Sequence, residues 1–136
     1  MVVLQRCCWV EEAVANQMWS IPPLTETVED VAAWLATTTA LGLWLDGRLV
    51  AMVRGSRSGD TWEVGRLAVV PDLRGRHLGN WMLDRIEERV EPGCVRYELF
   101  TGAKSERNQV LYERRGYRII GELRPGIVLM EKPVVS

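Results

Sequence analysis

The chain has 136 residues, of which 47% are hydrophobic and 26% are charged. This composition is typical of a soluble globular domain and excludes disordered, collagen-like and coiled-coil proteins. The formal charge is -1, from 17 basic and 18 acidic residues, and no long run carries one sign. We therefore expect one domain over residues 1–136 that does not bind nucleic acid through its overall charge, so that any anion site is local.

The cysteines and the apolar runs bear on location. The three cysteines are an odd number, and Cys7 and Cys8 are adjacent in a helix-compatible stretch where a disulfide between them would be strained. No basic leader precedes the first apolar residues, and no apolar run approaches the roughly 20 residues of a membrane helix. We expect a reduced, cytoplasmic protein that has no membrane partner and no metal site.

The first quarter of the chain has helical character. Residues 3–18 contain no glycine or proline and have apolar residues at helical spacing, and Ser20-Ile-Pro-Pro23 ends this helix. Thr27 followed by Asp30 is typical of a helix start, and apolar residues recur at helical spacing over 28–35. Two helices are therefore predicted before the first strand.

From residue 41 the pattern changes to strands. Asp46-Gly47 between two apolar runs predicts a hairpin of strands 41–45 and 48–54, and a polar turn at 56–60 leads to a third strand at 62–70. A helix at 78–90, a strand at 95–100 parallel to the third, a short helix at 105–115 and strands at 117–122 and 127–131 follow. The order predicts an α/β (α+β) fold with a mixed, mostly antiparallel central sheet flanked by helices.

Residues 67–80 carry the clearest functional signal. A buried strand runs through a loop of glycine and arginine into a helix start, where unpaired N–H groups and the positive helix end point to one place. Gly75 and Gly79 permit close approach of a ligand to the backbone, and Arg74 and Arg76 add positive charge. The pattern indicates a phosphate site, although it lacks the Gly-Lys-Ser/Thr of a P-loop and the acidic residue of a dinucleotide fold.

Two motifs resemble a known family. Arg74-Gly-Arg-His-Leu-Gly79, which follows Gly65-Arg-Leu-Ala-Val-Val-Pro71, is similar to the pyrophosphate loop of the GNAT superfamily of N-acetyltransferases. Ser105-Glu-Arg-Asn108-Gln-Val-Leu-Tyr112-Glu-Arg-Arg-Gly116-Tyr117 is similar to the Asn-and-Tyr motif of that family. The resemblance covers about residues 41–121 in order and spacing, and the two motifs together are fairly specific.

The resemblance implies a GNAT-like fold, acetyl-coenzyme A as co-substrate and the primary amine of a small molecule or peptide as acceptor, with direct attack and no acyl-enzyme. The chain departs from the family pattern at two places. His77 stands where the family has the first glycine of the loop, so its ring crowds the pyrophosphate unless it points to solvent. The family also begins with a strand, so here that strand is absent or the chain starts after it.

The resemblance also implies residue roles. Backbone groups of the strand residues Leu67, Ala68 and Val69 pair with the pantetheine arm and polarise the thioester, and the loop amides hold the pyrophosphate through Arg74, Gly75, Arg76, His77, Leu78, Gly79 and Asn80. Asn108 binds the cofactor arm, and Tyr112 protonates the leaving thiolate. Glu63 and Glu98 on neighbouring strands are candidates for a general base that acts through water.

These residues also have plainer interpretations. Tyr112 packs in a core, Asn108 caps a helix, and Glu63 and Glu98 are solvated or ion-paired. Trp9, Trp19 and Trp34 belong to the core or line an acceptor pocket. The alternative function is a non-catalytic acyl-coenzyme A-binding regulatory module. Nucleic-acid binding through arginines is weakly supported, because acidic residues intersperse them. A homodimer is a further expectation.

Overall fold

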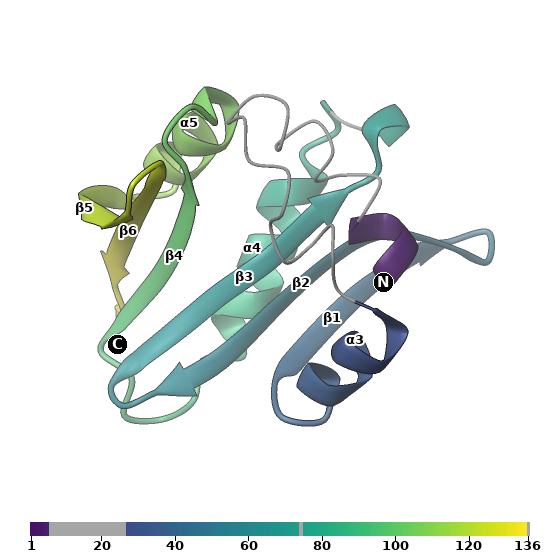
Figure 1. Cartoon of the computed structure of the whole chain (residues 1–136), viewed down its shortest axis with the longest axis horizontal. Helices are drawn as coiled ribbons and strands as arrows, with labels where there is room; N and C mark the ends of the chain where they lie inside the picture. Colours follow the sequence, from purple (N-terminus) through teal and green to yellow (C-terminus); the bar gives the residue numbers. More distant parts are fainter. Residues whose placement is uncertain (6–26, 74, 136) are drawn as a thin grey trace.

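A mixed sheet with helices on its two faces forms the centre of the computed structural model, which describes residues 1–5, 27–73 and 75–135 (Figure 1). The six strands have the order β1-β2-β3-β4-β6-β5. Neighbouring strands are antiparallel, except for the parallel pair β3 and β4. This confirms the predicted fold class. The described elements are α3 (Val28–Leu35), β1 (Thr39–Leu45), β2 (Arg48–Ser58), β3 (Thr61–Val69), the short 3-10 helix η1 (Pro71–Leu73), α4 (Leu78–Glu88), β4 (Arg96–Gly102), α5 (Glu106–Arg114), β5 (Arg118–Arg124) and β6 (Ile127–Pro133).

The predicted β1–β2 hairpin is confirmed, and the next turn is tighter than predicted. Asp46 and Gly47 both have positive φ, 51° and 77°, as a two-residue turn matched to the strand twist requires. Residues 56–58, predicted as part of a polar turn, belong to β2, and Ser58 is the register partner of Thr61. Polar side chains do not prevent strand pairing here because the pairing uses the backbone, and the side chains of Arg57 and Ser58 are exposed.

Two hydrophobic clusters lie on opposite faces of the sheet. On one face α4 packs on β2 and β3 through Met82, Leu83 and Ile86, which join Ala51, Val53, Trp62 and Val64. In Figure 1 this helix lies behind the two strands. On the other face Val50, Met52, Ala68 and Val70 pack with Leu4, and Trp34 of α3 packs against them. The alternation along β2 follows from the period of two in a strand.

Trp62 fixes α4 to the sheet. Its side chain is fully buried, and its Nε1 donates a hydrogen bond of 3.1 Å to the carbonyl of Ile86 in the last turn of α4. Gly55 on β2 makes room for the ring, because a Cβ added there would lie 2.6 Å from Cζ2 of Trp62. The large side chain of Trp62 and the absence of a side chain at Gly55 therefore both help to position α4 on the sheet.

The sheet opens between β3 and β4. Their parallel ladder pairs three positions and ends at Glu63↔Glu98, although β3 continues to Val69 and β4 continues to Gly102 beside β6. Beyond this point β3 places Arg66 and Leu67 opposite the single residue Val53 of β2, and Arg66 has a φ of 54°. A bulge of this kind bends a strand. The two strands diverge in Figure 1, and residues 67–69 of β3 beyond the ladder line a cleft.

The beginning of the chain was predicted as a long helix without a preceding strand. Residues 2–5 are helical, and the rest of the predicted helix 3–18 lies outside the described residues. Within the described ranges no strand pairs with the outer edge of β1. No helix in the described part of the chain is long and apolar enough to span a membrane.

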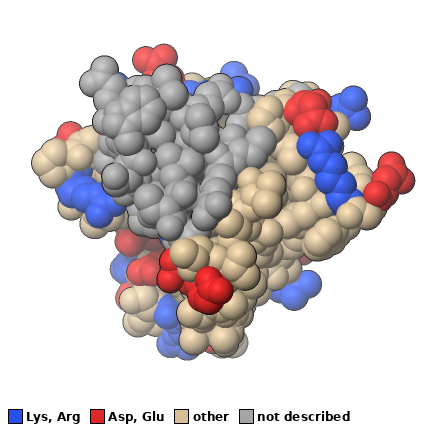
Figure 2. All heavy atoms as spheres, turned by 45° about the vertical axis from the view of Figure 1, so that its right-hand side comes forward, with Lys and Arg blue, Asp and Glu red and all other residues tan. Residues whose placement is uncertain are grey.

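Charges of both signs are interspersed on the surface. On the face shown in Figure 2, basic and acidic side chains lie near one another at several places around a broad uncharged area. One pair is bidentate: Arg48 at the start of β2 donates two hydrogen bonds of 3.0 Å to the carboxylate of Asp72 in η1. The guanidinium of Arg48 lowers the pKa of the Asp72 carboxyl. This pair connects the β1–β2 hairpin to the segment that leads into α4.

Candidate active site

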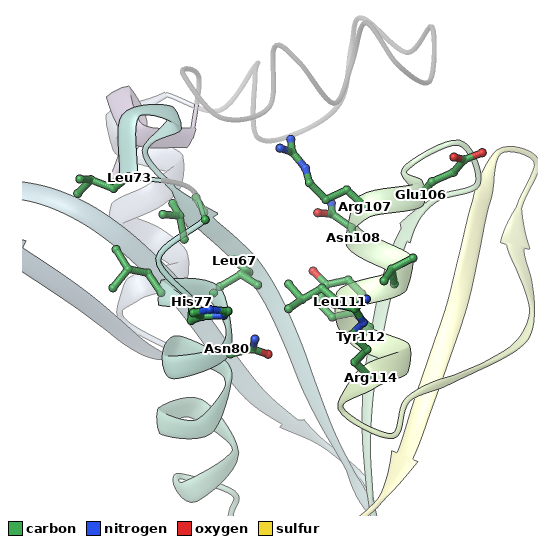
Figure 3. Close-up of a pocket in the computed structure, with 16 residues that line it drawn as sticks. Leu67, Leu73, His77, Asn80, Glu106, Arg107, Asn108, Leu111, Tyr112 and Arg114 are labelled. Carbon is green, nitrogen blue, oxygen red and sulfur yellow. The ribbon is translucent and has the colours of Figure 1, made fainter.

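A cavity of about 670 Å³ lies in the cleft, between the start of α4 and the face of α5 (Figure 3). The strand β3 supplies one wall through residues 67–69, and residues 73, 75 and 77–80 supply the loop and first turn of α4. The opposite wall is α5, from Glu106 to Arg114. Two parts of the chain that are far apart in the sequence, β3 with the loop into α4 and the helix α5, therefore face one space.

The loop before α4 and the first turn of this helix line the cavity. Gly75 and His77 both have positive φ, 84° and 61°, and His77 is the N-cap of α4 without a side-chain capping hydrogen bond. The first hydrogen bond of the helix runs from the amide of Trp81 to the carbonyl of His77, and the first turn contains no acidic residue. The amides of the first turn are thus available to an anion at the positive end of the helix.

The helix α5 places Asn108 and Tyr112 on the cavity. They are four residues apart and so lie on one face of the helix, and the Tyr112 side chain is buried with 7% exposed. Gln109 holds the entry to α5, since its Nε2 donates to the carbonyls of Gly102 and Ala103 at 3.0 Å. A Cβ added to Gly79 of α4 would lie 3.5 Å from Leu111 Cδ2, so the two walls meet at this point.

The end of α5 is capped by a backbone motif that includes Gly116. Its φ of 99° reverses the chain, the amide of Gly116 donates to the carbonyl of Glu113, and the amide of Tyr117 donates to the carbonyl of Tyr112, both at 3.0 Å. This pattern is a Schellman motif, in which glycine is favoured because it adopts positive φ without strain. The cap fixes the backbone of Tyr112.

A buried carboxylate on α4 gathers the side chains that follow this cap. Glu87 accepts a hydrogen bond of 3.0 Å from the hydroxyl of Tyr117 and pairs with Arg115 at 3.2 Å and with Lys132 at 2.6 Å. Burial, together with the negative charge of Glu87, raises the pKa of Tyr117, so its hydroxyl stays protonated and donates. The peptide carbonyl of Glu87 accepts from the hydroxyl of Tyr97 at 3.2 Å. Sequence alone places Glu87 among the polar positions of the helix.

Three glutamates form a row across the sheet at the base of the cleft. Glu63, Glu98 and Glu131 are register partners on β3, β4 and β6, on the face opposite α4. Glu63 is exposed and Glu98 is half-buried. Partial burial, and then the charge of Glu63, raises the pKa of the Glu98 carboxyl. None of the three lines the cavity described above.

A family model decides the relationship of the chain to known proteins. The model described as the acetyltransferase (GNAT) family matches residues 5–117. The chain belongs to the GNAT family of acetyltransferases. It is therefore an N-acyltransferase, as the two sequence motifs predicted.

Solved structures have the same GNAT fold. The PaiA N-acetyltransferase from Thermoplasma acidophilum in complex with coenzyme A has a TM-score of 0.82 at 15% identity, over 97% of this chain and 89% of that one. A putative acyl-CoA N-acyltransferase from Klebsiella pneumoniae has a TM-score of 0.68 at 26% identity, over 85% and 94%. A GNAT acetyltransferase from Elizabethkingia anophelis with acetyl-CoA bound has a TM-score of 0.66 at 13% identity, over 90% and 87%.

The predicted GNAT site residues divide into three groups. Ten of them line the cavity: Leu67, Ala68, Val69, Gly75, His77, Leu78, Gly79, Asn80, Asn108 and Tyr112. Arg76 is exposed in the loop and does not line it, and Glu63 and Glu98 lie at the end of the β3–β4 ladder. Arg74 lies outside the described residues. His77, whose ring was expected to crowd a phosphate unless it points to solvent, is exposed and is also one of the ten lining residues.

Sequence reasoning missed several residues of the GNAT cleft. Leu73, Glu106, Arg107, Val110, Leu111 and Arg114 also line it. The helical spacing around Asn108 and Tyr112 was a signal for most of them, since one helix face presents neighbours three and four apart. Among the tryptophans weighed for an acceptor pocket, Trp34 packs against the second hydrophobic cluster with the Arg54 guanidinium 4.5 Å from its ring centre. Trp9 and Trp19 lie outside the described residues.

Proposed function

We propose that this protein transfers the acetyl group of acetyl-coenzyme A to a primary amine by direct attack of the amine nitrogen on the thioester. One observation carries the proposal: uncapped amides at the start of α4 and the side chain of Tyr112 on α5 face one cavity, beside the bulged strand β3. An anion-binding helix end, a strand edge and a proton donor are the three parts that this reaction needs.

The cavity suits an elongated ligand that ends in phosphates. The amides of Leu78, Gly79 and Asn80 hold the pyrophosphate, with Arg74 and Arg76 as further positive charges. The backbone of β3 from Leu67 to Val69 pairs with the amide groups of the pantetheine arm, as one strand pairs with another. Asn108 donates to the same arm from the opposite wall, so the thioester is delivered toward Tyr112.

The proposed step balances in atoms and charge. The neutral amine nitrogen forms a bond to the thioester carbon, and the carbon–sulfur bond breaks after a tetrahedral intermediate whose oxygen accepts from the backbone of β3. The leaving thiolate takes the phenolic proton of Tyr112, and the nitrogen loses its extra proton to a base. The base then releases its proton to solvent and the phenol regains one from solvent, so the enzyme returns to its starting state without an acyl-enzyme.

Glu63 and Glu98 are the proposed bases, acting through water. Their place at the base of the cleft, where the β3–β4 ladder ends, favours this role. The raised pKa of Glu98 brings that carboxylate closer to the working pH, which improves a general base. The acceptor amine belongs to a small molecule or a peptide, and we place the whole chain, as one domain, in the cytoplasm.

Release of free thiol from acetyl-coenzyme A across a panel of primary amines tests the proposal against the alternative of a binding module. Turnover with at least one amine, together with the mass of the acetylated product, supports the enzyme. Saturable binding of acetyl-coenzyme A without turnover over the whole panel would instead favour the regulatory module.

Substitution of Gly79 tests the position of the pyrophosphate. We expect Gly79→Glu to weaken acetyl-coenzyme A binding at least about tenfold by calorimetry, because a carboxylate then faces the phosphates at the helix end. Gly79→Gln is the matched neutral control and should bind more tightly than Gly79→Glu. Both variants should fold, since the added Cβ meets Leu111 only at ordinary contact distance. Equal affinity of the two variants would show that the phosphates lie elsewhere.

A further inference from the structure

The contacts around Glu87 lie outside the cavity and have no role in the proposed chemistry. Glu87 sits in the last turn of α4 with a side chain that is 11% exposed, and one of its carboxylate oxygens binds both Arg115 and Tyr117. These two residues flank Gly116 immediately after α5. A buried carboxylate needs cationic or hydrogen-bonding partners. Here Arg115 and Tyr117 supply them from the end of the helix that carries Tyr112.

Arg115 reaches both ends of α4. Its Nη2 lies 2.8 Å from the Asp84 carboxylate and 3.2 Å from that of Glu87, while its Nη1 donates to the carbonyl of Asn80 at 3.4 Å. Asn80 belongs to the first turn, which lines the cavity. The planar guanidinium thus connects the end of α5 to the α4 wall at three points, which the single point charge of a lysine cannot do.

Tyr117 connects the same carboxylate to Tyr112. The ring of Tyr117 meets the ring of Tyr112 edge to face, with centroids 6.1 Å apart, while its hydroxyl is held by Glu87. The amides of Arg115 and Tyr117 both donate to the carbonyl of Tyr112 at 3.0 Å. The backbone and the ring of Tyr112 are therefore held by two residues whose side chains end on Glu87.

We propose that Glu87, Arg115 and Tyr117 form a clamp that positions Tyr112 against the first turn of α4. The clamp sets the distance between the proton donor on one wall and the ligand-binding amides on the other. These are positioning residues, because none of their side chains lines the cavity. The kinetic consequence of the clamp rests on the proposed function, whereas the placement of Tyr112 by the clamp does not.

Lys132 provides a matched control. It also pairs with Glu87, at 2.6 Å and with a similarly low exposure of 18% against 14% for Arg115. Its ammonium lies 5.3 Å from the ring centre of Tyr97 and 5.0 Å from that of Tyr117. No contact described for Lys132 reaches Asn80 or Tyr112. Arg115→Met and Lys132→Met each remove one cation from Glu87, and only Arg115→Met also removes the contacts with Asp84 and Asn80.

The three tyrosines of the chain give a direct readout without substrate. With tyrosine labelled by 13C at Cζ, each Phe variant assigns one NMR signal. We expect Arg115→Met to move or broaden the Tyr112 signal, and Lys132→Met to move those of Tyr97 and Tyr117 while Tyr112 stays within its linewidth. An unmoved Tyr112 signal in Arg115→Met, or equal displacement in both variants, would overturn the clamp. If Arg115→Met does not fold, Tyr117→Phe, which removes only the hydroxyl held by Glu87, replaces it and should move the Tyr112 signal.

Turnover gives the second readout. We expect Arg115→Met to lower kcat about tenfold or more, since a displacement near 1 Å can cost about 10²-fold, and Lys132→Met to stay within about twofold. The double variant Arg115→Met/Tyr112→Phe should be no slower than Tyr112→Phe, because both act on one step. If the loss in kcat of the double variant equalled the product of the two single losses, Arg115 would act by another route. A wild-type protein without turnover would refute the proposed function and leave the NMR result to decide the clamp.

Discussion

His77 is one of three non-glycine residues with positive φ among the described residues. It stands at the N-cap of α4 with φ 61° and ψ 21°, the left-handed region. A residue with a Cβ in this region loses roughly 1–2 kcal/mol. Glycine avoids that cost, but its greater conformational freedom in the unfolded chain lowers the free energy of unfolding by about 0.4–1 kcal/mol. We therefore expect His77→Gly to be more stable than His77→Ala by about 1 kcal/mol.

The comparison of these two variants isolates the backbone term, because both lack the imidazole. A difference of about 1 kcal/mol corresponds to roughly 4 °C in Tm for a chain of this size. Thermal unfolding followed by circular dichroism measures it. Arg76 is the control, since it is exposed in the same loop and its φ is not positive. Arg76→Gly should therefore be less stable than Arg76→Ala, the opposite order. Equal Tm values for the two His77 variants would refute a left-handed backbone at this position.

Two further predictions concern the sheet. Gly55→Ala should lower the free energy of unfolding by about 2 kcal/mol or more, because its Cβ would lie 2.6 Å from the buried ring of Trp62, whereas Gly65→Ala meets only Arg54 Nε at 3.7 Å and should cost much less in denaturant titrations. Because the folded pKa of Glu98 is raised above its unfolded value of 4.5, its ionisation destabilises the fold as pH rises through that range. Glu98→Gln should thus raise Tm at pH 7 and lose this advantage toward pH 4, and an advantage that stays constant with pH would contradict the assignment.

The sequence predicted the fold well where the signals are local. Asp46-Gly47 predicted a two-residue turn with positive φ at both positions, and the helix predicted at 78–90 is observed as α4, Leu78–Glu88. These features depend on turn chemistry and on the period of apolar residues, which neighbouring residues determine. The sequence also predicted the cavity-lining residues of the two GNAT motifs, because each motif lies in one continuous stretch of the chain.

The remaining features depend on contacts between distant segments. Glu87 has the pattern of a surface residue, and only the fold brings Arg115, Tyr117 and Lys132 to it from the end of α5 and from β6. The left-handed backbone at His77 was equally hidden, since most histidines have negative φ even though histidine is enriched in this region. The sequence therefore did not predict ion pairs between side chains from distant segments, or the positive φ of a residue that is not glycine.

The most direct test of the proposed mechanism is kcat for Tyr112→Phe, measured by thiol release with the best amine of the panel. The ring of Tyr112 is buried and phenylalanine keeps its packing, so the variant removes only the hydroxyl. We predict a kcat about 10²-fold lower, from loss of the general acid, with Tm and acetyl-coenzyme A affinity nearly unchanged. Wild-type turnover in this variant would contradict the assignment, and so would a joint loss of stability and binding, because the hydroxyl would then be structural.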